Sequence, residues 1–406
     1  LILSVLDAND QKIDSLIDTF VIGGSQDERL LNFDDFLKID IASINLDGPK
    51  SEGEDTAFIM YTSGTTSNPK GCPLSHSNMM HATIAMMERW TISDKDVFWD
   101  PLPMFHMSSI LPFSACLMAK SEFISTVHFD PDQSIKVLEE SEVSIAFPAF
   151  PAVMLALVNH PDFSSSKLSK IRIINNVAPV DTLRSFQEAL PNAKLVSAYG
   201  LTEASGVCSY GSPDDPLEKR ITTSGKPFKG VKIRIIHPET GEEVPTDEKG
   251  LIEISGPTVF KGYLNDPTKT TETLSSDGWL STGDFGSLSE DGFISYHGRL
   301  KDMLKVGGEN VAALEIESFY NNHEGVMISQ VVGVDDERLG EVPALFIETK
   351  EGVTLTAEEL IESAKGKISN FKIPRYVVFV DDWPMSSTKV QKFKLKDYDL
   401  GEKVFG

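Results

Sequence analysis

The sequence predicts an α/β protein with a large first domain of layered α/β subdomains plus a β-rich subdomain, and a small α+β domain at the end. The chain has 406 residues, which suits two or three domains at about 150 residues each. Short apolar runs alternate with helical patterns over residues 56–210, as in layered α/β proteins. From Gly225 onward, frequent Gly and Pro separate β-rich pieces, and a compact segment of mixed pattern closes the chain.

The first domain is predicted to contain a strand, a polar loop and a helix in succession. Residues 56–61 are strand-like, the loop occupies residues 62–71, and Ser75 or Ser77 can cap the helix that follows. The apolar positions that recur at helical spacing in this helix are Met80, Ile84 and Met87. Further strands are expected at residues 143–147, 170–174 and 194–198.

The later part of the chain should contain two more groups of elements. Strands at residues 231–236, 250–254 and 292–296 indicate a mostly antiparallel subdomain. The closing segment has helical patterns at residues 314–319 and 357–365 and extended ones at 327–334, 344–348 and 376–380. We therefore expect a first domain of residues 1–300 and a second of residues 301–406.

The loop at residues 61–71, Tyr-Thr-Ser-Gly-Thr-Thr-Ser-Asn-Pro-Lys-Gly, has the composition of a polyphosphate-binding turn. Between a strand and a helix, backbone N–H groups, hydroxyls and the positive helix end can converge on an anion, and Lys70 adds a full charge. A Walker A loop is excluded, because Pro69 stands where its second glycine belongs and Gly71 where its hydroxyl residue belongs. The loop thus indicates ATP but not a P-loop ATPase, and an ordinary surface turn could share its composition.

The net charge of −24 and the pI near 4.7 oppose binding to nucleic acid or anionic lipid over a broad surface. A site for a polyanion must therefore be a local basic island. Candidate islands are Arg299, Lys301 and Lys305, and Lys389, Lys392, Lys394 and Lys396. We expect Lys394 and Lys396 to be ordinary surface residues.

Cysteine usage and hydropathy predict the compartment. The three cysteines form no CxxC pair, which indicates a reduced, intracellular setting and no cysteine-bound metal. No targeting segment is visible, and Pro148 and Pro151 interrupt the longest apolar stretch, residues 145–158. The sequence predicts a soluble, cytoplasmic protein without membrane insertion.

Residues 61–71 resemble the signature of the adenylate-forming (ANL) superfamily, which includes acyl-CoA ligases, luciferases and peptide-synthetase adenylation domains. Further blocks resemble the family in its order, at residues 197–203, 278–284, 298–302, 305–311 and 384–390. The resemblance implies that the loop holds the phosphates of ATP, with Thr65 also close to the metal. The loop residues implied are Thr62, Ser63, Gly64, Thr65, Thr66 and Lys70. Ser67 departs from the family, in which glycine is common at that position.

The next blocks complete a nucleotide site by resemblance. Tyr199 stacks on adenine, Thr202 contacts phosphate, and Glu203 supports Mg²⁺, which takes oxygen ligands. Asp284 accepts hydrogen bonds from both ribose hydroxyls, since a carboxylate has acceptor sites on two oxygens. Arg299 binds ribose or phosphate through its fixed fork of donors. Further nucleotide contacts are expected at Ala178, Ala198 and Gly200. Taken singly, a core aromatic or a solvated acid would explain Tyr199 or Glu203.

Two catalytic positions follow from the same resemblance. His106, in the run Pro-Met-Phe-His, resembles the element that lines the acyl channel, either gating it or lying beside the path of the thiol. Lys389 resembles the terminal lysine that neutralises charge between the substrate carboxylate and the α-phosphate. Thr388 stands where glycine is usual, which is a departure from the family.

The block at residues 305–311 resembles the segment that faces the active site during thioester formation. Its residues are Lys305, Gly307, Gly308 and Glu309. Because this segment and Lys389 cannot occupy one site together, the resemblance implies a mobile small domain that rotates about Lys301.

The resemblance implies an acyl-CoA ligase, closest in look to the medium-chain fatty acid members, with ATP, Mg²⁺, coenzyme A and a carboxylic acid as ligands. Gly200 should leave the acyl pocket open to acids larger than acetate, and Asn175 and Asn176 leave an acid with a polar group possible. The alternatives are a stand-alone adenylation enzyme that loads a carrier protein, a luciferase-like enzyme and a non-enzymatic scaffold. The large domain looks N-terminally incomplete beside the family, and a homodimer is one option for assembly.

Overall fold

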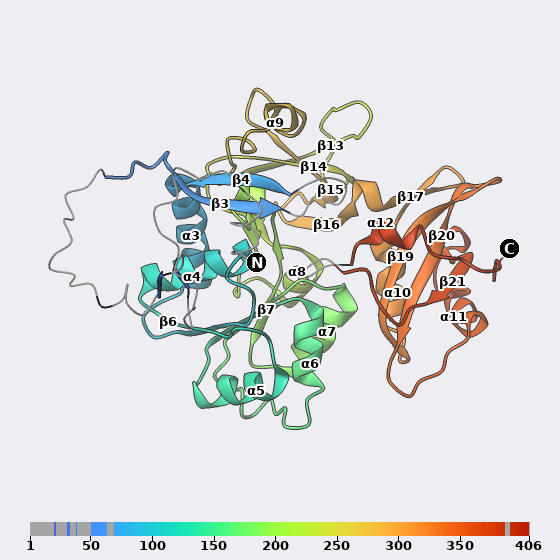
Figure 1. The fold of residues 1–406 in the computed structure, drawn as a ribbon, viewed down its shortest axis with the longest axis horizontal. Helices are drawn as coiled ribbons and strands as arrows, with labels where there is room; N and C mark the ends of the chain where they lie inside the picture. Colours follow the sequence, from blue (N-terminus) through green and yellow to red (C-terminus); the bar gives the residue numbers. More distant parts are fainter. Residues whose placement is uncertain are drawn as a thin grey trace. The chain divides into compact units, whose positions relative to one another are not determined.

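The computed structural model describes residues 50–62, 69–385 and 390–405, together with residues 20–21, 31–32 and 38. Leu1–Glu52 and Gly53–Gly406 are separate compact units. In the first unit, β1 (Phe20–Val21) pairs in parallel with β2 (Leu31–Asn32). The second unit combines helices with parallel and antiparallel sheets (Figure 1), so the predicted α/β class is confirmed.

A parallel sheet in the spatial order β6-β5-β7-β8-β9 carries the α/β part. Its strands are β5 (Val97–Asp100), β6 (Glu122–Ser125), β7 (Ile145–Ala149), β8 (Ile173–Asn176) and β9 (Lys194–Val196). The connecting helices are α4 (Met107–Ala119), α5 (Pro131–Glu140), α6 (Pro151–Val158) and α7 (Val180–Ala189). The predicted strands exist as β7, β8 and β9, displaced by at most three residues. The strand order reverses between β5 and β7, and ligands bind beyond the carboxyl ends of strands at such a point.

Two strands that pair with each other flank the predicted polar loop. β3 (Thr56–Thr62) pairs antiparallel with β4 (Lys70–Ser75), and α3 (His76–Trp90) begins only after β4. The prediction of a turn between strand and helix is therefore wrong, because residues 70–75 continue as a strand that buries Cys72 and Leu74 completely. The N-terminus of α3 carries a capping box in which Ser75 Oγ accepts from the Asn78 N–H, so this backbone donor of the helix end is already satisfied within the chain.

The buried face of α3 uses apolar residues other than those noted for their helical spacing. Met79, Ala82 and Met86 are buried, whereas Met80 and Ile84 of the predicted stripe are exposed. Both sets of residues fit helical spacing, and packing against α4 decides which of them lies inside.

The β-rich part is an antiparallel sheet in the order β13-β14-β15-β16, as predicted. Its strands are β13 (Lys232–Ile236), β14 (Gly250–Ser255), β15 (Leu280–Leu288) and β16 (Ile294–Arg299). A smaller antiparallel sheet contains β10 (Ala198–Tyr199), β11 (Ser209–Tyr210) and β12 (Lys226–Pro227). The helices of this region are η2 (Thr202–Ala204), α8 (Leu217–Thr222) and α9 (Pro267–Thr273).

The 3₁₀ turn η3 (Leu300–Asp302) leads into the C-terminal region, shown in orange to red in Figure 1. Its sheet has the order β18-β17-β20-β19, with β21 beside β20. The strands are β17 (Met303–Val306), β18 (Glu309–Ala312), β19 (Val326–Asp336), β20 (Gly340–Thr349) and β21 (Tyr376–Phe379). The helices are α10 (Ala313–Asn321), α11 (Ala357–Ala364), η4 (Asn370–Lys372) and α12 (Lys392–Leu395). The predicted mixture of helices and strands is present, and the β17–β18 hairpin is an addition to it.

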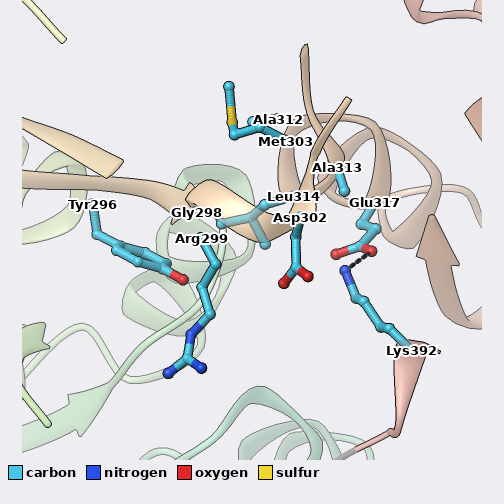
Figure 2. A pocket seen from close by; sticks show the side chains of 10 residues that line it. All are labelled: Tyr296, Gly298, Arg299, Asp302, Met303, Ala312, Ala313, Leu314, Glu317 and Lys392. Atoms are coloured by element: carbon cyan, nitrogen blue, oxygen red, sulfur yellow. Dashed lines mark hydrogen bonds and ion pairs between the residues drawn. The ribbon is translucent and has the colours of Figure 1, made fainter. Parts of the chain in front are cut away.

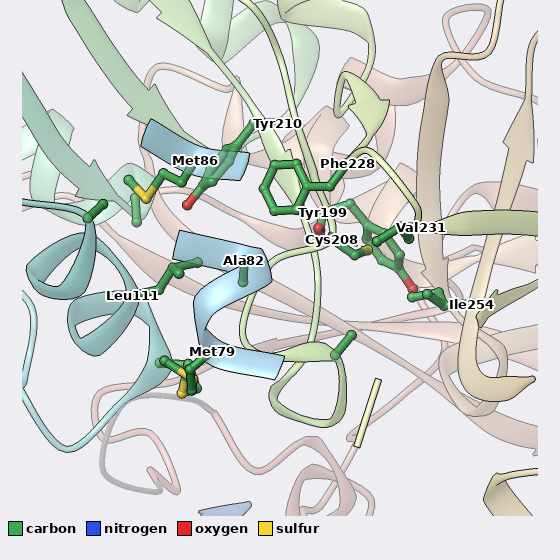
Figure 3. Close-up of a cluster of buried hydrophobic side chains, with 14 of the residues drawn as sticks. Met79, Ala82, Met86, Leu111, Tyr199, Cys208, Tyr210, Phe228, Val231 and Ile254 are labelled. Atoms are coloured by element: carbon green, nitrogen blue, oxygen red, sulfur yellow. Dashed lines mark hydrogen bonds between the residues drawn. The ribbon is translucent and has the colours of Figure 1, made fainter. Parts of the chain in front are cut away.

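A large buried cluster joins α3 to the sheets that follow it (Figure 3). The side chains labelled there include Met79, Ala82, Met86, Leu111, Tyr199, Cys208, Tyr210 and Phe228. The block that contains Tyr199 is therefore anchored in the core rather than on a surface loop.

The three cysteines, Cys72, Cys116 and Cys208, are free and buried. Among the helices that the structure describes, none combines the length and apolar character needed to cross a membrane.

Candidate functional site

Three residues predicted to bind a nucleotide converge from separate segments. Asp284 in β15 and Arg299 in β16 are cross-strand partners, and Asp284 Oδ1 lies 3.3 Å from Arg299 Nε. Tyr199, at the end of β10, donates its hydroxyl to Asp284 Oδ2 at 2.8 Å. Asp284 is buried while Arg299 reaches the surface. The pairing of β15 with β16 thus places a guanidinium at the edge of a buried carboxylate.

The ring of Tyr199 is stacked on Tyr296, with ring centroids 5.9 Å apart and 27° between the planes. Burial first, and then the charge of Asp284, raises the pKa of the Tyr199 hydroxyl well above its usual value. The hydroxyl therefore stays protonated and acts as a donor. Stacking of adenine on this ring remains a prediction.

A second group of candidate residues lies near Lys70, at the start of β4. The Tyr263 hydroxyl donates to Glu203 Oε1 at 2.7 Å, and the Lys70 ammonium lies 4.7 Å from the centre of the Tyr263 ring. Glu203 belongs to η2, and Lys70 is the first residue of β4. The lysine of the loop and the predicted metal-supporting carboxylate therefore share one aromatic partner, which the sequence analysis missed.

His106 is the N-cap residue of α4, and its ring lies 4.9 Å from that of Phe105. The loop that carries it follows β5, at the carboxyl edge of the parallel sheet. Asp100 anchors this loop: it accepts from the Leu102 N–H at 2.8 Å and from Ser109 Oγ at 3.0 Å. Asp100 is completely buried, and burial raises the pKa of its carboxyl group to about 8. His106 thus lies at the carboxyl edge of the sheet, in a loop anchored by an acid that no sequence motif marks.

The β17–β18 hairpin contains Lys305 in β17, Gly307 and Gly308 in the turn and Glu309 at the start of β18, all exposed. Gly307 has a φ of 61° and Gly308 a φ of 92°, a left-handed conformation that favours glycine. The Gly307 N–H donates to the Leu339 carbonyl at 2.7 Å. The turn has a defined shape and faces solvent.

A small cleft lies where β16 passes into the C-terminal region (Figure 2). Arg299 and Asp302 line it together with Glu317 of α10 and Lys392 of α12, and Glu317 and Lys392 form an ion pair. The Val331 N–H donates to Glu317 Oε1 at 2.7 Å. Figure 2 shows the Arg299 side chain and the Glu317–Lys392 pair on separate segments around this cleft.

Several predicted residues lie outside the described residues, namely Ser63, Gly64, Thr65, Thr66 and Lys389, as do the departures Ser67 and Thr388. The ends of both segments are described. Thr62 is opposite Lys70 in the β3–β4 pair, and Met385 forms a bridge with Val390.

The remaining predicted contacts lie around the β8 and β10 ends. Ala178 follows β8, Ala198 begins β10 and Thr202 begins η2. At Gly200 a Cβ atom would lie 2.4 Å from the Gly206 carbonyl oxygen. Glycine is therefore required here by backbone packing, a different reason from the open acyl pocket that we expected.

The described ranges hold no group of three or more His, Cys, Asp or Glu side chains that could bind a metal ion. Burial raises the pKa of the Cys72 and Cys116 thiols to about 12, so both are protonated at neutral pH. Mg²⁺ usually takes one or two carboxylates together with phosphate oxygens and water. Glu203 fits this pattern, since no described residue donates a hydrogen bond to its Oε2.

Two family models match the chain. One, described as AMP-binding enzyme, matches residues 3–264, and the other, AMP-binding enzyme C-terminal domain, matches residues 315–390. The medium-chain acyl-CoA ligase ACSF2, mitochondrial, of Mus musculus is 36% identical over 353 residues, which are 84% of this chain and 57% of that protein. The chain spans about six tenths of the length of the curated relatives it matches.

Solved structures are similar as well. The ATP-bound MatB protein of Rhodopseudomonas palustris has a TM-score of 0.78 and 32% identity, over 86% of this chain and 69% of that one. The o-succinylbenzoate CoA synthetase (MenE) of Bacillus subtilis, in complex with its acyl-adenylate intermediate, has a TM-score of 0.82 and 26% identity, over 92% of this chain and 75% of that one. MenE has also been solved with ATP and a magnesium ion.

Proposed function

Because the chain belongs to the family of AMP-binding enzymes, we propose that it is an ATP-dependent, AMP-forming acid–thiol ligase. A carboxylic acid attacks ATP to give an acyl-adenylate and pyrophosphate, and the thiol of coenzyme A then displaces AMP to give the thioester. The observation that carries this proposal is the convergence of Tyr199, Asp284 and Arg299 from separate segments.

In the first step the chain must overcome the repulsion between a carboxylate and a triphosphate. Lys70 offsets the negative charge of the phosphates and the hydroxyls of the loop donate hydrogen bonds to them. Asp284 and Arg299 hold the ribose, and Lys389 neutralises charge between the two reacting groups. Fixed cations lower such a barrier because they are in place before charge develops. Mg²⁺ held at Glu203, with Thr65 close to it, would add positive charge at the phosphates.

The second step uses other residues. The exposed hairpin residues Lys305, Gly307, Gly308 and Glu309 face the site after the C-terminal region rotates, and His106 lies beside the path of the thiol. We place the boundary between the rotating parts at Lys301, with a large domain of residues 1–300 and a small domain of residues 301–406.

We propose a medium-chain fatty acid or a similar acid as the substrate. The similarity to the Mus musculus protein, which is named a medium-chain acyl-CoA ligase, supports this class. Asn175 and Asn176 are fully or almost fully buried at the end of β8. Because their side-chain amides can form hydrogen bonds, the proposal also includes an acid that carries a polar group.

Acid-dependent exchange of pyrophosphate into ATP tests the first step. We expect exchange with medium-chain acids and, on addition of coenzyme A, stoichiometric release of AMP. Absence of exchange with every acid of a broad panel would favour a scaffold over an enzyme. Exchange without coenzyme A-dependent release of AMP would favour carrier-protein loading, and acid-dependent light emission with oxygen would favour a luciferase-like enzyme.

A cytoplasmic location and a homodimeric assembly also belong to this proposal. Fractionation of cells that express the protein tests the first. Light scattering after size exclusion tests the second, with a single monomer mass as the contrary result.

A further inference from the structure

The segment between β14 and α9 connects the two sides of the candidate phosphate site. The Phe260 N–H donates to the Glu203 carbonyl, and the Leu264 N–H donates to the Gly71 carbonyl, both at 2.9 Å. Gly71 is the neighbour of Lys70. The segment is thus hydrogen-bonded to both stretches of chain that carry the candidate charges, and it fixes their separation.

Tyr263 lies within this segment and only 8% of its surface is exposed. Its N–H donates to Thr270 Oγ1 at 2.9 Å, and its ring packs edge-on against Phe260 with centroids 4.9 Å apart. Gly262 permits this arrangement, because a Cβ atom there would lie 2.5 Å from the Thr270 side chain. Backbone and ring are both held by the protein itself.

Lys70 and Glu203 carry opposite charges and use different parts of Tyr263. The ammonium lies over the face of the ring, and the carboxylate accepts the hydroxyl hydrogen. Among the described residues, no ion pair joins the two charges directly. Both charges act on the neighbouring Cys72. Burial raises the pKa of its thiol to about 12, the charge of Glu203 raises this pKa as well, and the charge of Lys70 lowers it. Tyr263 therefore contacts both charges, with no ion pair between them among the described residues.

We propose that Tyr263 is a positioning residue that presents the Glu203 carboxylate and the Lys70 ammonium to a metal-bound triphosphate, an inference that rests on the proposed function. A hydroxyl that donates to Oε1 fixes the carboxylate and leaves Oε2 for a divalent cation or its waters. A cation over an aromatic face keeps its full charge, so it remains attractive to phosphate.

Tyr263→Phe keeps the ring and removes only the hydroxyl. We expect it to weaken binding of Mn²⁺, in the presence of a non-hydrolysable ATP analogue, by about 3- to 10-fold, the size of one hydrogen bond. Binding of the analogue without metal should not change. Electron paramagnetic resonance measures the first and calorimetry the second. Tyr210→Phe is the matched control and should change neither, because Tyr210 is buried in the same core and its hydroxyl has no hydrogen-bond partner among the described residues.

Unchanged Mn²⁺ affinity in Tyr263→Phe overturns the inference. So does a loss that persists in a Glu203→Gln background, because a residue that acts through Glu203 has nothing left to position there. Tyr263→Leu also removes the ring and should weaken metal-free binding of the analogue by about 3-fold, and unchanged binding would overturn the part played by Lys70. If the unaltered protein binds no analogue with or without metal, the proposed function fails as well.

Discussion

Asp100 holds the loop of His106 from a completely buried position, and burial raises the pKa of its carboxyl group to about 8. In an unfolded chain an aspartic acid has a pKa of about 3.9. Between these two values the folded protein keeps a proton that the unfolded chain has lost. The free energy of unfolding contributed by this group therefore falls as the pH rises through that window, and it levels off above about pH 8.

Asp100→Asn cannot ionise and should remove this dependence. We predict that the free energy of unfolding declines from about pH 6 to about pH 8 more steeply in the unaltered protein than in the variant, by up to about 1.4 kcal/mol per pH unit. Urea unfolding across this range measures it. Asp94→Asn, at an exposed acid of the preceding loop, should keep the slope of the unaltered protein. Equal slopes in all three proteins would contradict a protonated Asp100.

Residues within an ordered motif could be predicted, whereas residues defined only by a distant contact could not. Tyr199, Asp284 and Arg299 each belong to a run with a recognisable order, and the structure brings them together. Tyr263 lies 60 residues from Glu203, and nothing in its neighbourhood of the sequence encodes that hydrogen bond. Asp100 likewise gains its role from burial, which one sequence does not reveal.

At the level of single elements, α12 is attached to α10 by the ion pair between Lys392 and Glu317. Glu317 is buried, and besides Lys392 it accepts from the Val331 N–H. Lys392→Met should therefore leave a buried carboxylate with one amide donor. We predict a loss of about 1 to 3 kcal/mol in the free energy of unfolding.

Urea unfolding of Lys392→Met, Glu317→Gln and the double variant measures this coupling. The double variant should recover part of the loss, because no unpaired charge remains. Lys396→Met, at an exposed lysine just beyond α12, should change stability by less than about 0.5 kcal/mol. A cost for Lys392→Met no larger than for Lys396→Met would mean that the ion pair does not hold α12.

Most elements with a clear period were predicted, and the failures have local causes. Residues 70–75 form β4 although Gly71 and Pro73 interrupt any strand pattern, because pairing with β3 and burial of Leu74 outweigh local preference. In α3 two apolar stripes have the same period, so the sequence predicts the helix but not its buried face.

At the scale of the whole molecule, the succession of α/β, antiparallel and mixed parts follows from the sequence, but the placement of the C-terminal region does not. Lys392 lines the same cleft as Arg299, and the proposed Lys389 precedes it by three residues in the sequence. The turn with Gly307 and Gly308, in contrast, is exposed. In the reaction that we propose, this turn takes part in the second step only after the C-terminal region has rotated.

Lys301, within η3 at the start of the C-terminal region, is the proposed pivot. Proline fixes its own φ near −65°, lacks an N–H and restricts the residue before it, so Lys301→Pro should lock the turn. We predict that Lys301→Pro retains acid-dependent pyrophosphate exchange but loses thioester formation from supplied acyl-adenylate and coenzyme A by about 10-fold or more. Lys301→Ala, which leaves the backbone free, is the control and should lose far less.

Lys389→Ala should do the reverse, losing exchange and sparing thioester formation, because its charge serves only the attack on ATP. Equal losses of pyrophosphate exchange and thioester formation in Lys389→Ala would contradict a role for Lys389 in the first step alone, which is the reason for proposing the rotation. Thioester formation at the unaltered rate in Lys301→Pro would contradict rotation about Lys301.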